Sequence, residues 1–426
     1  MTLCCAICNG PAEKSGFKIM PLPFFTTDQR IYIPGGLRND EYKSFPLCKN
    51  CYRKLQKGVY FISKHFDFPI GGSRGLRFWL IPSLEPSFVK ELLNYVESKT
   101  LYLKNLQSIC DRLETIEEIT EEESEEPTFL TYIALFYYFD QQGHMRVLTT
   151  ADGVYPNRLK EIVKEKSELD RRYPYFALPK FSPRLPKIYF GFPILADFWL
   201  YGRETGGQRE LAKLISSVYL ASKVDVEYLN SILIKRIRGE LRGPNTKVGI
   251  KSLENLVPLV FKAMMTMEFL EKADVILMKG DSSLEPKSNS DADDLVEELL
   301  RFLNEHREVI VPGAQRAICC AGVLTGIALV EQEEKIGSTS FWSRLNRLEL
   351  NFERVRSLVP QTVEKLRQYR AMDKYKNLVA HILANEISQL DEKEAKRFSN
   401  DLISLMFSIG IGEGYLLTKL AKKSGE

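Results

Sequence analysis

The pattern of hydrophobic and polar positions changes along the chain, and each part predicts different elements. Short runs rich in aromatic and β-branched residues predict strands at 30–33 and 76–81. The clearest hairpin joins the strand-like runs 128–139 and 144–150, because turn-forming residues occupy positions 140–143 between them. Strands therefore belong to the first part of the chain.

Apolar residues recur at helical spacing from 93 to 119, and again through most of the chain after Pro156. The longest apolar run, Ile318 to Val330, contains two glycines and is too short to span a bilayer, so it predicts a buried core helix. The whole pattern predicts an α+β fold: an N-terminal module with β-hairpins, a mainly helical body and a C-terminal helical bundle. The predicted bundle helices are 294–306, 312–336, 351–372, 374–390 and 391–423.

Two polar segments divide the chain. The acidic run 117–126 predicts a solvated loop or linker, and the Ser-, Asp- and Pro-rich segment 281–294 predicts a second linker. We therefore expect a module at 1–92, a body at 93–280 and a bundle at 295–426.

Composition narrows the class of protein only a little. The chain has 426 residues and a formal net charge of +3, within the ordinary range for a globular protein. Its start contains no apolar segment of the kind found in secretory signals, so we expect a soluble, cytoplasmic protein without a membrane segment. In that compartment, paired cysteines are better explained as metal ligands than as disulfides.

The strongest chemical signal is two C-x-x-C pairs, at 5–8 and 48–51. Two such pairs complete a tetrahedral zinc site, and four thiolates leave no coordination position for substrate, so the zinc would be structural. Gly10 is expected to adopt the positive φ that a metal knuckle needs, and Cys4 is an alternative ligand. The predicted ligands are Cys5, Cys8, Cys48 and Cys51.

Other motifs do not indicate an enzyme. The four histidines stand alone in the sequence, and no paired carboxylates suggest acid–base chemistry. Gly410, Gly412 and Gly414 follow a helical pattern, which favours helix packing over a dinucleotide-binding loop. The remaining cysteines are expected to be buried apolar residues: Cys110, Cys319 and Cys320.

Basic residues are unevenly distributed. From Arg158 to Lys251 there are 19 Lys and Arg against 10 Asp and Glu, and a second excess runs from Lys335 to Lys376. Clusters of this kind suit phosphate contacts, although Lys and Arg also solvate helix faces. The glycines around 71–75 suggest a loop that enters a groove of DNA. The predicted nucleic-acid-binding residues are Arg74, Arg77, Arg158, Lys235, Arg236, Arg238, Arg242, Lys247, Arg344, Arg347, Arg354, Arg356, Arg367 and Arg370.

The order of these features resembles the large subunit of type I-B CRISPR effector complexes (Cascade). That family carries two C-x-x-C pairs, an aromatic hairpin and a helical C-terminal half. A substantial domain is expected before the cysteine pairs in the family, whereas here they begin at residue 5. The similar stretches are Cys5 to Cys8, Phe24 to Asp28, Leu47 to Gly58, Leu80 to Pro82, Tyr132 to Arg158, Gly322 to Gly326, Phe341 to Asn346 and Leu358 to Tyr369.

The resemblance implies a non-catalytic role in RNA-guided DNA recognition. Its expected partners are the guide RNA (crRNA), target DNA beside the protospacer-adjacent motif (PAM), the other Cascade subunits and a helicase–nuclease. The C-terminal bundle resembles the Cascade small subunit, which supports the displaced strand of the R-loop. The basic residues would hold nucleic-acid backbones, so binding should weaken steeply with salt.

Two other classes of protein remain open from the residues. A stand-alone zinc-ribbon protein acting on nucleic acid or in transcription would bind tightly without partner subunits. A metal-dependent nuclease would need a cluster of carboxylates or histidines, and the sequence does not display one.

Overall fold

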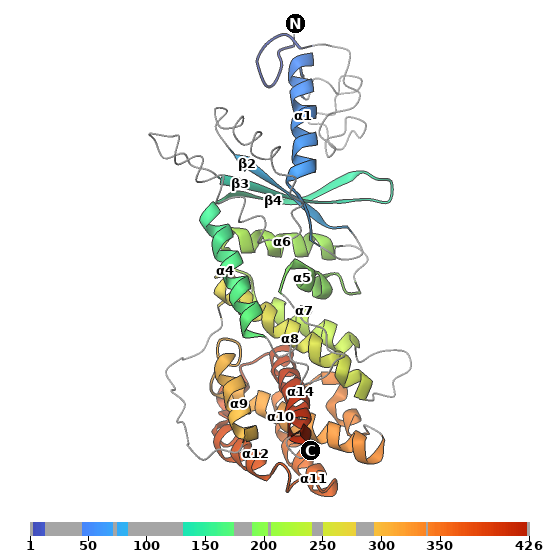
Figure 1. The fold of residues 1–426 in the computed structure, drawn as a ribbon, viewed down its shortest axis with the longest axis vertical. Helices are drawn as coiled ribbons and strands as arrows, with labels where there is room; N and C mark the ends of the chain where they lie inside the picture. The colour runs from blue at the N-terminus through green and yellow to red at the C-terminus, as the bar shows by residue number, and fades with distance from the viewer. Residues whose placement is uncertain are drawn as a thin grey trace. The chain divides into compact units, whose positions relative to one another are not determined.

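The protein is described by a computed structural model and divides into two compact units (Figure 1). Unit 1 comprises Met1–Val163 and Gly202–Leu220, and unit 2 comprises Lys164–Tyr201 and Ala221–Glu426. The structure describes residues 3–12, 45–70, 75–83, 131–173, 190–202, 206–240, 250–277, 294–337 and 340–423.

Unit 1 is built on an antiparallel sheet with the strand order β1-β2-β3-β4. Its strands are β1 (Asp67–Pro69), β2 (Arg77–Ser83), β3 (Thr131–Phe139) and β4 (Met145–Val154). Strand β2 and the β3–β4 hairpin confirm the strands predicted around 76–81 and 128–150. The hairpin turn is held by Asp140, whose carboxylate accepts hydrogen bonds from the backbone N–H groups of Gln142 and His144 at 3.0 and 2.9 Å.

Both faces of this sheet are covered by helices, which explains why β3 is apolar on both sides. On one face, Trp79 and Tyr137 pack against Val59 and Ile62 of helix α1 (Lys49–His65). On the other face, Phe78 and Phe136 pack against Tyr219 of helix α6 (Gly207–Leu220), with ring centroids 6.0 and 6.2 Å apart. Because successive strand residues point to opposite faces, a sheet covered on both sides needs an almost continuous hydrophobic run.

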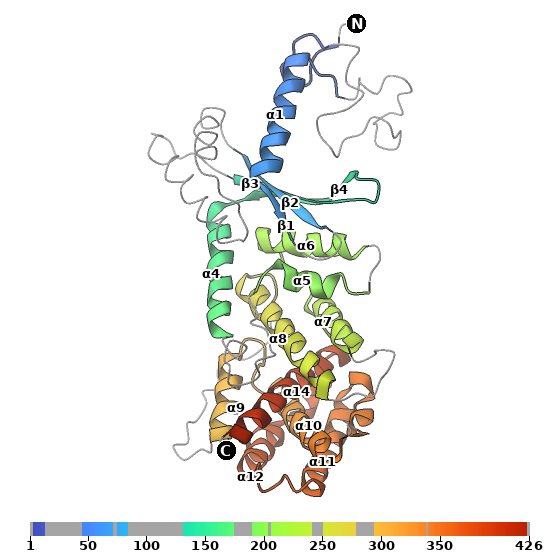
Figure 2. The same cartoon turned by 45° about the vertical axis from the view of Figure 1, so that its right-hand side comes forward.

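Unit 2 is helical (Figure 2). Helix α4 (Pro156–Arg172) begins in unit 1 and continues into unit 2, which also contains the short helices that connect the longer ones. The further helices are α5 (Phe192–Trp199), α7 (Val226–Glu240), α8 (Ile250–Lys272), α9 (Asp294–Glu305), α10 (Ala314–Ile336), η4 (Ser340–Leu348), α11 (Phe352–Gln368), α12 (Lys376–His381), η5 (Ile382–Glu386), η6 (Ile387–Gln389), α13 (Glu392–Ala395) and α14 (Asn400–Lys423).

Helices α10 and α14 form the centre of unit 2 and cross with their backbones in close contact. A Cβ atom at Gly410 would lie 1.9 Å from the carbonyl oxygen of Cys319, and one at Gly322 would lie 2.1 Å from that of Phe407. A Cβ at Gly414 would lie 2.3 Å from the carbonyl oxygen of Val323. Gly410 and Gly414 therefore serve helix packing, as predicted from the sequence, whereas a Cβ at Gly412 would meet only side chains at ordinary distances.

The same two helices are long and apolar enough to cross a membrane by length and composition. However, 94% of each apolar window is buried inside the protein. Cys319 and Cys320 lie in this interior with no exposed surface, as predicted, and burial raises the pKa of both thiols. The apolar run from Ile318 to Val330 is a core helix.

The predicted bundle helices differ from the structure mainly at their ends. The segment predicted as one helix at 391–423 is divided into α13 and α14, and the predicted helix at 374–390 passes from α12 into π and 3₁₀ turns. Helix η4 was not predicted. The strand at 30–33, the helix at 93–119, Cys110 and the acidic run lie outside the described residues. The domain boundary at 92 and nearly all of the 281–294 linker also lie there, so the domain division stays a prediction.

Candidate metal centre and basic residues

Four cysteine sulfurs converge at the N-terminal end of helix α1 in unit 1. The Sγ atoms of Cys5, Cys8, Cys48 and Cys51 all lie within 4.8 Å of one another. Sulfurs bonded to one zinc at about 2.3 Å lie about 3.8 Å apart in a tetrahedron, and the Cys8 and Cys48 sulfurs are 3.7 Å apart. The cluster has the size of a tetrahedral Cys₄ zinc site.

Local backbone geometry creates this arrangement. The first pair lies in a tight turn, in which the N–H of Cys5 donates to the carbonyl of Gly10 at 2.7 Å and Asn9 N–H donates to the Cys5 carbonyl at 2.9 Å. The second pair opens helix α1, where Cys48 is the N-cap and its sulfur accepts from Cys51 N–H at 3.4 Å. A helix N-terminus favours the negative charge of a thiolate.

The sequence-based assignment of positive φ to Gly10 was wrong. The residue in the left-handed region is Asn9, with φ 58°, and asparagine adopts this conformation more readily than most residues. Gly10 instead lies close to the metal ligands, since a Cβ there would be 3.5 Å from the Cys8 sulfur. The turn that the metal knuckle needs is therefore made one residue earlier.

Local surroundings shift the pKa values of Cys5, Cys48 and Cys51 in different directions. Burial acts to raise the pKa of Cys5, but backbone N–H groups of Cys48, Cys8 and Ile7 lower it to about 6. A backbone hydrogen bond from Cys51 lowers the pKa of Cys48, whereas burial raises that of Cys51 to about 12. Because thiolates are the metal-binding form, backbone N–H groups prepare part of the site for a cation.

These residues fit a structural zinc ion better than any other role. Cys5 and Cys51 are buried, Cys8 is exposed and Cys48 is half-buried, so the site is closed on one side by the protein itself. Cys4, the alternative ligand, is exposed and lies outside the group of four sulfurs. When bound, zinc would join the N-terminal turn to α1 and supply no open coordination position.

In unit 1, both described arginines of the predicted nucleic-acid set are held by intramolecular contacts. Arg77 lies in strand β2 and forms a bidentate pair with Asp67, with its Nη2 and Nε atoms at 3.0 Å from the carboxylate, and Tyr137 donates to the same carboxylate at 2.8 Å. Arg158 donates to the carbonyl of Val218 at 2.7 and 3.0 Å. Arg74 lies outside the described residues.

Helix α7 carries three residues of the set in different surroundings. Arg238 donates to the Leu348 carbonyl and forms an ion pair with Asp401 at 2.8 Å, so it joins α7 to α14. Arg236 pairs with Glu240 and stacks over the Tyr201 ring. Lys235 is exposed. The last two members of this cluster, Arg242 and Lys247, lie outside the described residues.

All but one of the six C-terminal arginines of the set are exposed. Arg344, Arg347 and Arg370 are exposed and form no ion pair among the described residues. Arg356 and Arg367 are 62% and 63% exposed in their side chains and have acidic neighbours at 3.4 and 3.7 Å, contacts that contribute little in water. Arg354 instead donates to the Arg344 carbonyl at 2.6 Å.

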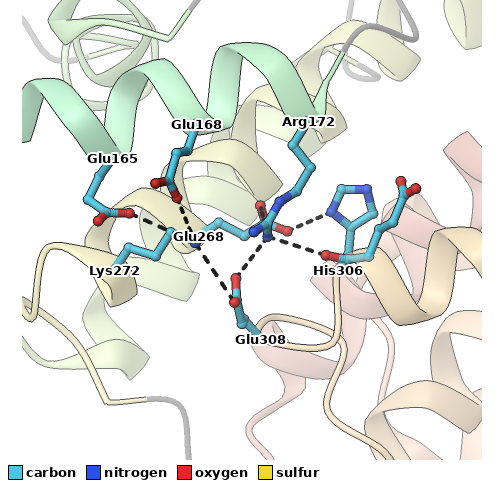
Figure 3. Close-up of polar contacts among 8 residues, drawn as sticks. Glu165, Glu168, Arg172, Glu268, Lys272, His306 and Glu308 are labelled. Carbon is cyan, nitrogen blue, oxygen red and sulfur yellow. Dashed lines mark hydrogen bonds and ion pairs between the residues drawn. The ribbon is translucent and has the colours of Figure 1, made fainter. Parts of the chain in front are cut away.

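A network of buried charges occupies another part of unit 2 (Figure 3). Nδ1 of His306 lies 2.6 Å from a carboxylate oxygen of Glu268, and neither side chain is exposed. Arg172, at the end of α4, lies 3.7 Å from Glu268 and 3.0 Å from Glu308. Tyr173 is buried and packs its ring 4.9 Å from that of His306, so it belongs to the core of unit 2.

The family of the chain follows from its comparison with known proteins. The family described as CRISPR-associated protein TM1802 matches in two parts, its central domain over residues 2–154 and its C-terminal domain over residues 190–424. Together these matches cover most of the chain, so the protein belongs to this CRISPR-associated family. No curated protein matches the sequence.

One basic element was missed by the sequence analysis. Helix α1 contains five Lys and Arg residues and no acidic residue in its sequence KNCYRKLQKGVYFISKH. The signal is present in the sequence, as a run of basic residues that directly follows the second C-x-x-C pair.

Proposed function

We propose that this protein is the non-catalytic large subunit of a type I-B CRISPR surveillance complex in the cytoplasm. In this role it would contact PAM-side target DNA and the guide-RNA backbone, stabilise the R-loop and help to recruit a helicase–nuclease. The observation that carries the proposal is the match of both the central and the C-terminal domain of a CRISPR-associated family to one chain.

The candidate metal centre supports a structural and not a catalytic use of metal. Four thiolates satisfy the tetrahedral preference of zinc and leave no position for an activated water. A zinc site of this kind would hold Cys5 and Cys8 of the N-terminal turn against helix α1, and so would stabilise a folded module that presents a surface to partners.

The exposed arginines of unit 2 support contact with a nucleic-acid backbone. Arg344, Arg347 and Arg370 are exposed and carry no internal ion pair among the described residues, so their charges are available to phosphates. Backbone contacts bind without reading sequence, which is the behaviour needed where base pairing with the guide provides specificity.

The proposal is tested by expressing the chain together with the other genes of its native cluster and purifying it. The RNA bound to it is then sequenced, and its metal content is measured. Repeat-derived guide RNA, further effector subunits and about one zinc per chain are the expected result. A chain that purifies alone, lacks RNA and binds DNA tightly would contradict the proposal and favour an independent zinc-ribbon protein.

A further inference from the structure

Helix α1 in unit 1 has an unusual distribution of charge. It carries Lys49, Arg53, Lys54, Lys57 and Lys64, and it has no acidic residue. All five side chains are exposed, and none forms an ion pair among the described residues. The helix is therefore a concentrated source of uncompensated positive charge.

The basic residues gather on one side of the helix. At 100° per residue, Lys49, Arg53, Lys57 and Lys64 fall within a sector of about 80°, which also includes Tyr60. The apolar residues fall on the opposite side, where Leu55 packs against the cysteine cluster and Ile62 against the sheet. The stripe formed by Lys49, Arg53, Lys57, Tyr60 and Lys64 is here called the α1 basic stripe.

Helix stability does not account for this arrangement. Lys49, Arg53 and Lys57 are spaced four residues apart, and like charges at this spacing destabilise a helix. Lys49 also lies in the first turn, where the helix dipole disfavours positive charge. Lys64, in the last turn, is favoured by the dipole, so the first three basic residues of the stripe are the ones that oppose helix stability.

Charge balance at the metal centre accounts for only one end of the stripe. Lys49 follows Cys48 directly and Arg53 is two residues from Cys51, so both can offset part of the negative charge of four thiolates. Lys57 and Lys64 lie about 13 and 24 Å beyond Cys48 along the helix axis, farther than a Debye length at physiological salt. The position of Lys64 in the last turn of the helix favours its charge, but neither the metal centre nor the dipole explains Lys57.

We propose that the α1 basic stripe binds a single strand of nucleic acid, with its lysines and arginine on phosphates and Tyr60 stacked on an unpaired base. Tyr60 is 68% exposed, although it has a large apolar ring, and Lys64 lies 5.9 Å from the ring centroid. Aromatic rings placed among basic residues are the common platform for single strands, because every base offers a π-face.

This inference deepens the proposed function by naming a surface for one strand, but it is tested on the zinc-loaded full chain alone. The probe is a labelled mixed-sequence DNA strand of about 20 nucleotides, with the matching duplex measured beside it. Affinity is measured over a series of salt concentrations for the wild type, for R53Q/K57Q/K64Q and for Y60A.

A matched control removes the same amount of charge elsewhere. Lys393, Lys396 and Arg397 are exposed, lie in unit 2 near acidic residues and are outside the predicted nucleic-acid set. The variant K393Q/K396Q/R397Q should bind like the wild type. Melting temperature and zinc content show whether each variant is folded, and the single variant K57Q replaces the triple variant if the latter is not.

The α1 triple variant should bind the single strand at least about tenfold more weakly than the wild type. The slope of its plot of log affinity against log salt concentration should be shallower by about two units. Y60A should lower single-strand affinity about 5- to 100-fold, keep the salt slope and affect duplex binding less. An unchanged slope in the triple variant, absence of binding by the wild type, or equal loss of single-strand and duplex binding in Y60A overturns the inference.

The two proposals fail separately. If guide RNA co-purifies with the chain but the α1 variants bind like the wild type, the proposed function stands and the inference about the α1 basic stripe is rejected. Conversely, if strand binding depends on α1 but the chain never co-purifies with guide RNA, the stripe is supported and the proposed function is contradicted.

Discussion

His306 and Glu268 form a buried polar pair in unit 2, with Nδ1 of the imidazole 2.6 Å from a carboxylate oxygen and neither side chain exposed (Figure 3). Glu268 belongs to α8 and His306 follows α9, so the pair links two helices that are separated in sequence by the segment around residue 285. The nearby Arg172 adds α4 to the same network.

Replacing one member of this pair should destabilise unit 2. Glu268→Leu leaves His306 and Arg172 without their buried acceptor, and we expect a loss of about 3–5 kcal/mol in unfolding free energy by urea denaturation. Glu297→Gln, at an exposed position of α9, is the control and should change stability little. The double variant Glu268→Leu/His306→Leu should recover part of the loss; additive losses would contradict the coupling.

The crossing of α10 and α14 predicts a difference between neighbouring glycines. Gly410→Ala places a Cβ 1.9 Å from the Cys319 carbonyl oxygen, so the helices must separate, and we expect a loss of about 3 kcal/mol or more. At Gly412 the nearest atom would be an ordinary 3.6 Å away, in a side chain of α8, so Gly412→Ala should be neutral or stabilising. Thermal unfolding of both variants distinguishes the two positions.

Cys4 and Cys5 are adjacent in the sequence, but their substitution should affect bound zinc differently. Cys5→Ser should reduce bound zinc from about one per chain toward zero and destabilise unit 1, because a buried ligand is lost. Cys4→Ser changes an exposed side chain outside the four-sulfur cluster, so zinc content should not change. Metal analysis after gel filtration is the measurement, and equal zinc loss in both variants would show that the ligand set is different.

Glu413 predicts a pH dependence of stability. This residue is buried in α14, and burial, with added repulsion from Glu298 and Glu305 and partial relief from Arg301, raises its pKa to about 8. The folded state therefore keeps a proton on this carboxyl at pH values where the unfolded chain, in which the carboxyl has its ordinary pKa of 4.5, has already released it. The contribution of neutral Glu413 to the free energy of unfolding is therefore full below pH 4.5. It falls between pH 4.5 and 8 and is lost above pH 8.

Glu413→Gln removes this ionisation. Relative to the wild type, the variant should gain stability as the pH rises from 5 to 9, by on the order of 1.4 kcal/mol for each pH unit within the titration window. Urea unfolding at several pH values checks this prediction, with Glu297→Gln as the exposed control. Parallel stability profiles for Glu413→Gln and the wild type would show that Glu413 is not protonated in the fold.

Substitutions of the predicted nucleic-acid-binding residues should fall into two groups, those that weaken binding and those that lower stability. The variant R344Q/R347Q/R370Q removes exposed charges and should weaken binding equally for all sequences, with a lower salt slope and unchanged melting temperature. Arg238→Gln should instead lower stability by about 1–3 kcal/mol, because the Asp401 ion pair and the contact with Leu348 are lost. A sequence-selective loss in the first variant would contradict backbone binding.

The four-cysteine cluster was predictable because the spacing that creates it is local. Each C-x-x-C pair places two sulfurs within one turn of chain, and this spacing alone singled out the four cysteines whose sulfurs converge. The positive φ was assigned to the wrong residue, since the hydrogen bonds that select Asn9 run between Cys5 and Gly10 and depend on the folded turn.

Charge was much harder to interpret from sequence. Arg238 and Arg344 are equivalent in a count of basic residues, yet the first is paired with Asp401, 163 residues away, and the second is exposed. Sequence separation carries no information about such a partner. For the same reason the buried contact between Glu268 and His306 could not be foreseen.

The sequence by itself determined the α+β class, the β3–β4 hairpin, most helices of the C-terminal bundle and the four-cysteine site, because propensity, periodicity and ligand spacing act over a few residues. The tertiary structure decided that α1 and α6 cover opposite faces of the sheet, that glycines of α10 and α14 meet backbone to backbone, and which arginines are exposed. These features depend on contacts between distant segments, and packing selects them only when the whole chain folds.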